Sequence, residues 1–346
     1  MLKLCILVPA KDEELVIGRT IESILRAGVK PEDIHIVDDG SSDRTYEIAK
    51  SYGVWVMRNE KNVGKAHSIA LAVQHFQLLW HYDLISLMDA DTRVDENYFN
   101  AAWARFESDE NVTVVCGRVK SVPRNWLTAY RCYVYFVTHL VYKKGQSAMG
   151  VITVAPGCAA TYRTSIFSEL RWDNDTLVED ADVTVQIHLK KLGTIAYEHD
   201  AVVHTQDPKT LHDYTKQMHR WYVGAWQIVQ KYKLLFGTKK INLETMLLMG
   251  EGLLFSIAAA LLPLWLVLFP RKAFLVLSID WLWMMTMCVV AGIVEKRKDV
   301  VLYAPIFQLI RYIDCLTLIC GFWSINIRRK KISGWFFVNR YTEEVQ

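Results

Sequence analysis

The segment from Leu84 to Asp91 reads LISLMDAD, an apolar run that ends on two carboxylates. Short apolar runs bounded by turn residues are typical of strands that are buried on both faces of a parallel sheet. Three similar runs precede it, at residues 4–8, 34–37 and 54–57. Apolar residues with helical spacing separate these runs, at residues 14–27, 41–51 and 65–76. Strands that alternate with helices predict a doubly wound α/β sheet.

The predicted strands end on polar and turn residues. Pro9 and Ala10 follow the first strand, Asp38 and Asp39 the second, and Asp89 to Asp91 the fourth. In such sheets ligands bind beyond the carboxyl ends of the strands, so we expect these residues to surround one crevice. The first strand is not followed by Gly-x-Gly-x-x-Gly, which argues against a dinucleotide-binding domain.

Asp89 and Asp91 form a candidate metal site. If the strand continues through them, both side chains lie on the same side, because side chains alternate along a strand. Two carboxylates give a hard, oxygen-rich site for Mg²⁺ or Mn²⁺, which takes further ligands from water and substrate phosphates. A solvated acidic loop is the alternative, since Asp-x-Asp is common by chance.

Two further groups fit a nucleotide ligand. A carboxylate at Asp38 or Asp39 could accept an N–H of a base, although the neighbouring serines also account for the turn as a helix cap. Lys65 lies at a predicted helix start, where the helix dipole and the ammonium both favour an anion. A solvated lysine explains the same residue without a ligand.

Glu179 and Asp180 are candidates for acid–base chemistry. A carboxylate beside a like charge can have a raised pKa, which suits a base that takes a proton from a hydroxyl group. The spacing alone favours the alternative, which is acidic residues at a helix N-terminus.

The segment from Gln217 to Trp221 reads QMHRW and lies in a predicted helix. Arg220 could hold a diphosphate through charge-assisted hydrogen bonds. Trp221 offers a flat apolar face to a sugar ring. A packed tryptophan beside a surface arginine is the alternative.

The C-terminal third has a different composition. Hydrophobic residues make up 52% of the 346 residues, and most of the excess lies after residue 245. The runs at 246–269 and 274–294 are long enough to span a bilayer, and a third apolar segment, 300–326, is predicted to be spanning, interfacial or re-entrant. Basic clusters at 296–298 and 328–331 both favour the cytoplasm, which favours two full spans over three.

These patterns predict a catalytic domain at 1–235, on the cytoplasmic side, and a membrane domain at 236–346. The short apolar start runs into charged residues, so we expect no signal peptide. Seven cysteines without a Cys-x-x-Cys pair fit reduced thiols. A net charge of +3 gives no reason to expect nucleic acid. The aromatic segment 126–143 is expected either at the membrane surface or packed on the α/β domain.

Taken in order, the motifs resemble those of the family 2 glycosyltransferases, over about Leu4 to Trp226. The likeness is greatest to the membrane-embedded synthases of cellulose, chitin, hyaluronan and poly-N-acetylglucosamine. The motifs that carry it are Val8 to Ala10, Val37 to Ser41, Asn62 to Ala66, Asp89 to Asp91, Gly157 to Arg163, Glu179-Asp180 and Gln217 to Trp221.

The resemblance implies a GT-A fold and an inverting, metal-dependent transfer from a nucleotide-diphosphate sugar, a UDP-sugar above all. It implies Asp180 as the base and Asp91, with Asp89, as the metal site. The implied donor-binding residues are Pro9, Ala10, Asp38, Asp39, Lys65, Asp89 and Arg220. The implied acceptor-binding residues are Gly157, Glu179, Gln217 and Trp221.

One departure from the family pattern stands out: Met218 lies where the five-residue motif usually has an arginine. With few spans, a polymer channel within one chain is not expected, although a homo-oligomer could form one. Alternatively, the product could be short or lipid-linked, and we expect a saccharide or a lipid-linked acceptor. Two alternatives remain at this point: a polyprenyl-phosphate glycosyltransferase, and a non-catalytic membrane scaffold.

Overall fold

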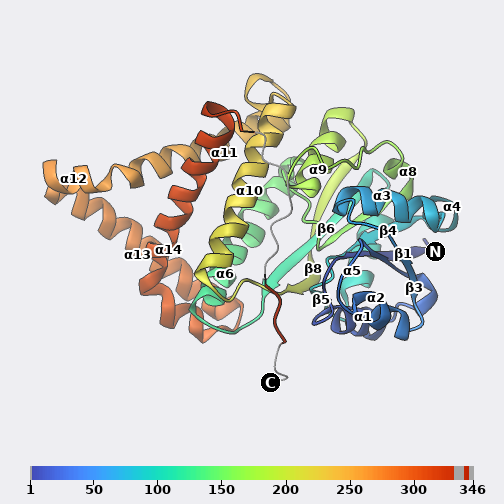
Figure 1. Ribbon diagram of the computed structural model, residues 1–346. Helices are drawn as coiled ribbons and strands as arrows, with labels where there is room; N and C mark the ends of the chain where they lie inside the picture. The colour runs from blue at the N-terminus through green and yellow to red at the C-terminus, as the bar shows by residue number, and fades with distance from the viewer. Residues whose placement is uncertain (1, 331–338, 343–346) are drawn as a thin grey trace. The chain divides into compact units, whose positions relative to one another are not determined.

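The computed structural model describes residues 2–330 and 339–342, which form two compact units (Figure 1). Unit 1 comprises the described residues of 1–120, 142–206 and 339–346. Unit 2 comprises those of 121–141 and 207–338. The division into compact units does not show which residues lie in a membrane. The boundary expected near residue 235, between the catalytic domain and the membrane domain, therefore stays a prediction.

Unit 1 is built on one sheet with the strand order β3-β2-β1-β4-β7-β6-β8-β5. The strands are β1 (Leu4–Ala10), β2 (Ile34–Asp38), β3 (Trp55–Arg58), β4 (Leu84–Leu87), β5 (Thr92–Val94), β6 (Val112–Ser121), β7 (Ala160–Arg163) and β8 (Thr194–Thr205). The four predicted strands are β1 to β4, and they pair in parallel. The predicted α/β fold class is confirmed.

The sheet is mixed rather than mostly parallel. Strand β7 pairs antiparallel with both β4 and β6, and β5 pairs antiparallel with β8. These later strands were not predicted, because their pairing partners lie far away in sequence and their apolar runs are short or broken by charges. They extend the sheet beyond β4.

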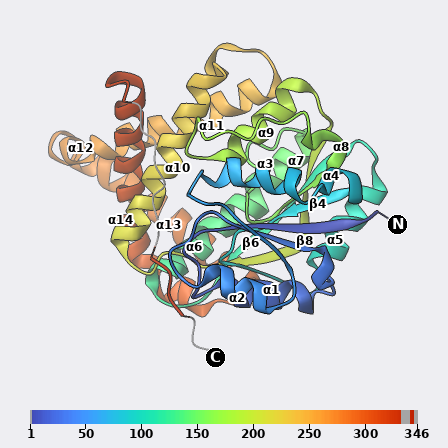
Figure 2. The ribbon, with the colours of Figure 1, turned by 45° about the vertical axis from the view of Figure 1, so that its right-hand side comes forward.

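Helices cover both faces of this sheet. They are α1 (Ile17–Arg26), α2 (Thr45–Ser51), α3 (Lys65–His75), α4 (Leu78–His81), α5 (Tyr98–Ser108), α7 (Lys144–Met149), α8 (Thr164–Phe167) and α9 (Glu179–Lys190), with a 3-10 turn at Pro31–Asp33. Figures 1 and 2 show α3 and α9 over one face and α1 and α2 over the other. Ile69 on α3 and Ile187 on α9 pack with Leu87 of β4 in one buried cluster.

Unit 2 is helical. Its helices are α6 (Trp126–Phe136), α10 (Leu211–Lys231), α11 (Lys240–Ala260), α12 (Leu262–Leu268), α13 (Pro270–Val294) and α14 (Lys298–Phe322), with π-helical turns at Val137–Lys143 and Trp323–Ile327 and a 3-10 turn at Leu234–Phe236. The aromatic segment predicted at 126–143 begins as α6. Tyr130 on α6 packs in a buried cluster with Met284 of α13 and Phe307 of α14.

Within the described residues, three helical segments are long and apolar enough to cross a membrane: Lys240–Ala260, Pro270–Val294 and Lys298–Ile327. The first predicted run, 246–269, is divided after Ala260, and Pro263 in the next turn lacks the N–H that a continuing helix needs. The third segment is one continuous run of 30 residues that accommodates Pro305. A run of this kind fits a spanning or an interfacial helix better than a re-entrant one.

The described C-terminal residues 339–342 return to unit 1, and we call them the C-terminal strap. The buried side chain of Gln206 donates to Tyr341 O at 2.8 Å and accepts from Tyr341 N at 3.2 Å. Tyr341 itself is buried. The strap is therefore fixed by a reciprocal pair of buried hydrogen bonds.

Gly64, which precedes α3, is expected to tolerate no side chain. Its φ is +89°, and an added Cβ would lie 2.5 Å from Asn174 Nδ2, whose amide donates to Val63 O. Gly28 has a similar φ of +86° but open space around it, so Gly28→Ala isolates the backbone strain, about 1 kcal/mol. We predict a clearly larger fall in melting temperature for Gly64→Ala, measured by thermal unfolding in detergent. Equal shifts would contradict the role of Asn174.

Candidate active site

The carboxyl ends of β1, β2 and β4 meet at one edge, as the sequence predicts. Ala10 is in register with Asp38, and Asp39 N donates to Ala10 O at 2.8 Å. On the other side of β1, Met88 N donates to Leu7 O at 3.1 Å. The residues predicted after each of these strands therefore lie around a common edge of the sheet.

Asp38 and Asp39 are both buried, and both carboxylates have partners in the chain. Asp38 accepts from Ser41 N at 2.9 Å and is paired with Arg58 at 3.1 Å. Asp39 accepts from Val63 N at 2.8 Å and from Gly64 N at 2.9 Å. Asp39 thus fixes the loop that leads into α3, and an N–H of a nucleotide base would have to exchange with these internal donors.

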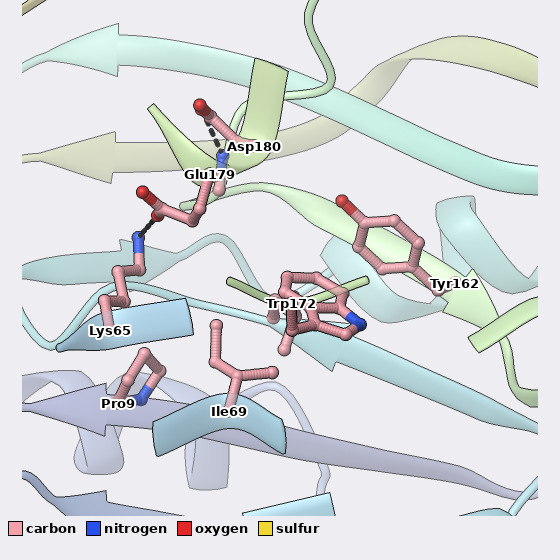
Figure 3. Close-up of a pocket in the computed structure, with 9 residues that line it drawn as sticks. Pro9, Lys65, Ile69, Tyr162, Trp172, Glu179 and Asp180 are labelled. Carbon is pink, nitrogen blue, oxygen red and sulfur yellow. Dashed lines mark hydrogen bonds and ion pairs between the residues drawn. The ribbon is translucent and has the colours of Figure 1, made fainter. Parts of the chain in front are cut away.

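Lys65, the first residue of α3, joins two other predicted motifs. Its Nζ lies 2.6 Å from Asp89 Oδ1 and 2.6 Å from Glu179 Oε1. Figure 3 shows the lysine side chain pointing to Glu179. Burial opposes the charge, but the two carboxylates outweigh it and raise the pKa of Lys65 well above its usual value. The ammonium is therefore a fixed positive charge in the site.

Asp180 lies in the first turn of α9, next to Glu179. Its Oδ2 accepts from Gly157 N at 3.1 Å and its Oδ1 from Ala181 N at 2.8 Å. Burial, and then the neighbouring Glu179 carboxylate, raise the pKa of Asp180 despite the opposing charge of Lys65. This shift of the Asp180 pKa is in the direction that favours a base for a hydroxyl group.

Gly157 is needed for a close approach. A Cβ at this position would lie 3.1 Å from Lys65 Nζ and 3.6 Å from Glu179 Oε1. A side chain here would therefore press on the ion pairs that join α3 to α9.

Asp89 and Asp91 do not continue the strand. Strand β4 ends at Leu87, and Thr92 N donates to Asp89 O at 3.1 Å to close a turn, so the strand alternation that would align the two side chains does not apply. Asp89 is paired with Lys65, and Asp91 Oδ2 lies 2.5 Å from Arg340 Nη1.

The carboxylate oxygens of Asp89 and Asp91 suit a hard divalent cation, but these two side chains provide few ligands. Among the described residues, no group of three or more His, Cys, Asp or Glu side chains is arranged to hold a metal ion. Asp89 and Asp91 could therefore supply only part of a coordination shell, and a substrate diphosphate and water would complete it.

The sequence interpretation missed two charged residues of the site. Arg340 of the strap forms a bidentate pair with Glu13, through Nη2 at 2.6 Å and Nε at 2.7 Å. Glu13 follows the first strand closely, as the predicted site residues do, and could have been found from that position. Nothing in the sequence around Arg340 marks it, because it lies after the hydrophobic third of the chain.

A narrow pocket opens beside Lys65 and Asp180 (Figure 3). Its lining comprises Pro9, Lys65, Ile69, Leu87, Gly157, Tyr162, Trp172, Glu179 and Asp180. The volume is about 10 Å³, roughly the room for one water molecule. A sugar could enter only if some of these lining side chains moved.

The remaining predicted residues, Gln217, Arg220 and Trp221, lie on α10 in unit 2. There the guanidinium of the buried Arg131 lies over the rings of Trp221 and Tyr135, at 4.7 Å from each centroid. Arg131 Nε also lies 3.0 Å from Asp207 Oδ1. One face of Trp221 is therefore packed on a cation.

Met218, the departure from the family motif, is buried in the same cluster. Its sulfur lies 3.6 Å from Arg131 Nη1. An arginine at position 218 would bring a second positive charge against Arg131, so a neutral side chain suits this packing. The structure gives Met218 a local reason within unit 2.

Residues 5–171 match the family model described as Glycosyl transferase family 2. The chain carries a family 2 glycosyltransferase domain. The predicted family is confirmed by this match, which covers Lys65, Asp89 and Asp91 and ends before Glu179 and Asp180.

Two curated relatives extend the comparison. A poly-beta-1,6-N-acetyl-D-glucosamine synthase from Staphylococcus epidermidis is 25% identical over 244 residues, 68% of this chain and 58% of the relative. A probable glycosyltransferase, YdaM, from Bacillus subtilis (strain 168) is 28% identical over 247 residues, with the same two shares. The chain thus spans less than two thirds of the length of these relatives.

Among solved structures, the mannosyltransferase PcManGT from Pyrobaculum calidifontis, in complex with GDP-Man and Mn²⁺, is similar with a TM-score of 0.63. It is 17% identical, and the match covers 89% of this chain and 87% of that one. The likeness confirms the predicted GT-A fold.

Proposed function

We propose that this glycosyltransferase transfers a sugar from a UDP-sugar to a saccharide acceptor at a membrane surface, with inversion at the anomeric carbon. The observation that carries the proposal is the cluster at Lys65. One ammonium joins Asp89 to Glu179, next to an aspartate whose pKa is raised. The cluster combines a cation for a diphosphate with a base for an acceptor hydroxyl.

Asp180 is the base in this proposal. Its carboxylate takes the proton from the acceptor hydroxyl as the oxygen attacks the anomeric carbon and the nucleoside diphosphate leaves from the opposite face. A single displacement of this kind inverts the anomeric centre. Lys65 can exchange its carboxylate partners for the diphosphate oxygens, which stabilises the charge that develops on the leaving group.

The donor is assigned to the edge formed by Pro9, Ala10, Asp38 and Asp39, where β1 and β2 end side by side. The relative named as a poly-N-acetylglucosamine synthase makes UDP-N-acetylglucosamine the first donor to test. The similar mannosyltransferase was solved with GDP-Man, so a guanosine donor is the comparison.

Asp91, with Asp89, would hold Mg²⁺ or Mn²⁺. Bound there with the diphosphate, such an ion neutralises charge on the leaving group. The solved mannosyltransferase contains Mn²⁺, which supports a divalent cation.

Gly157, Glu179, Gln217 and Trp221 are assigned to the acceptor, and Arg220 to the diphosphate. Gly157 and Glu179 lie at the same pocket as Asp180. A saccharide acceptor makes use of an aromatic ring such as Trp221, whereas a polyprenyl phosphate does not require one.

The three apolar helices support an integral membrane protein. The basic clusters at 296–298 and 328–331 are the reason for assigning unit 1 to the cytoplasmic side. The strap adds a constraint on the number of crossings. Residues 339–342 belong to unit 1, so the chain that leaves unit 1 after residue 206 returns to the same side. An even number of crossings follows, and we expect two of the three candidate helices to cross fully.

The function is tested by a donor and acceptor screen with the full chain in detergent. We expect transfer from a UDP-sugar to a saccharide, and a fall of about 10²-fold or more for Asp180→Asn, because the base is lost. The exposed Asp200→Asn is the matched control. Unchanged transfer by Asp180→Asn would remove the base assignment, and turnover with polyprenyl phosphate alone would reassign the acceptor.

The raised pKa of Asp180 predicts the acid limb of the rate profile. Asp180 stays protonated, and inactive as a base, to a higher pH than an ordinary aspartate with its pKa of about 3.9. Glu179→Gln removes the like charge, lowers the pKa of Asp180 and should move the acid limb of kcat/KM to lower pH. The exposed Glu169→Gln should leave the limb in place. A limb that moves upward in Glu179→Gln would contradict the proposed electrostatics.

The even number of crossings can be tested by labelling. In a background without native cysteines, Lys330→Cys and Glu107→Cys should react with a membrane-impermeant thiol reagent from the same side. Glu107 marks unit 1, because it lies exposed on α5. Labelling of Lys330→Cys only from the opposite side would mean an odd number of crossings.

A further inference from the structure

The strap brings a basic side chain to the carboxylate assigned to the metal. We propose that Arg340 is a built-in cation that holds Asp91 and competes with the divalent cation for it. The inference rests on the proposed function only for the identity of the competing ion. It assigns to the C-terminal strap a direct role in the affinity of the site for metal.

The position of the strap does not depend on the charge of Arg340 alone. Gln206 and Tyr341 exchange two buried hydrogen bonds, and the Tyr341 side chain is packed away from solvent. Tyr341 is the residue next to Arg340. These contacts therefore hold the Arg340 backbone near the site even when the ion pairs of the guanidinium change.

The guanidinium itself is shared between two acidic residues. Nε and Nη2 bind both oxygens of Glu13, and Nη1 lies 2.5 Å from Asp91 Oδ2. The side chains of Glu13 and Asp91 are only 11% and 8% exposed, so solvent screens these charges little. A buried carboxylate requires a positive partner, and Arg340 supplies it for both.

A metal ion and the Arg340 guanidinium would compete for the carboxylate of Asp91. A divalent cation binds a carboxylate oxygen at roughly 2.0–2.6 Å. An ion on the Asp91 oxygen that Nη1 now contacts would lie within a few ångströms of the guanidinium, and the two positive charges repel each other. Arg340 can stay bound to Glu13 when a metal ion takes Asp91, because two of the three contacts of Arg340 are with Glu13.

Asp89 is also paired with a basic side chain of the chain itself, since it forms an ion pair with Lys65. Both carboxylates assigned to the metal are thus neutralised by basic side chains of the chain itself. A metal–diphosphate complex carries a positive ion and negative phosphates together. Asp89 and Asp91 could then bind the metal ion, while Lys65 and Arg340 could bind the phosphate oxygens. We therefore expect weak metal binding alone and tighter binding with a nucleoside diphosphate.

The test measures Mn²⁺ binding to the full chain in detergent, from the electron paramagnetic resonance signal of free Mn²⁺, without any sugar donor. Arg340→Gln removes the competing charge and should tighten binding about tenfold, the scale of a lost partly buried ion pair. Arg329→Gln removes the same charge from the tail outside the strap and should leave the affinity unchanged. Asp91→Asn should abolish the tight site in either background.

A second variant leaves every charge in place. Gln206→Ala removes both hydrogen bonds to Tyr341, so it should loosen the strap and tighten Mn²⁺ binding by a smaller factor. It also keeps the test decisive if Arg340→Gln does not fold. Arg340→Lys, which keeps the charge but not the fork, should stay close to the wild type.

Unchanged or weaker Mn²⁺ binding in both Arg340→Gln and Gln206→Ala would overturn the proposal, and weaker binding would make Arg340 a support of the metal site. Binding that does not depend on Asp91 would overturn it as well. The outcome is separable from the proposed function. Tighter Mn²⁺ binding together with an absence of sugar transfer would leave the competition standing and remove the reaction.

Discussion

The ammonium of Lys65 lies 2.6 Å from the carboxylates of both Asp89 and Glu179, and the candidate site depends on this pair of contacts. They join the start of α3, the turn after β4 and the start of α9. Asp39 fixes the loop before Lys65 by accepting hydrogen bonds from the two amides that precede α3. Gly157 has no side chain, which leaves room for the ammonium of Lys65. Asp180 is then held beside Glu179, where burial and the like charge raise its pKa.

The same principle, a cation shared by buried carboxylates, recurs at the strap. Arg340 neutralises Glu13 and Asp91 as Lys65 neutralises Asp89 and Glu179. In unit 2 the buried Arg131 is held by Asp207 and by aromatic faces. Opposite charge stabilises each of these buried groups, and in unit 1 we propose that it also links the affinity for a divalent cation to the position of basic side chains.

Much of the site could be predicted because it follows local rules. The parallel strands were recognisable as apolar runs, and their carboxyl ends carry Ala10, Asp38 and Asp89. The order of the motifs indicated the family, which the matched domain confirms. The geometry of Asp89 and Asp91 was not predictable in the same way, because a turn after Leu87 replaces the alternation that the prediction assumed.

The sequence by itself determined the α/β fold class, the family and the three apolar segments, because each of these is written in short-range patterns of polarity and in the order of motifs. Only the tertiary structure decided the antiparallel half of the sheet, the partners of the carboxylates and the return of the strap to unit 1. Glu13 and Arg340 are separated by almost the whole chain, and no periodicity links them. Their contact exists because buried carboxylates need a cation and the folded chain brings one to them.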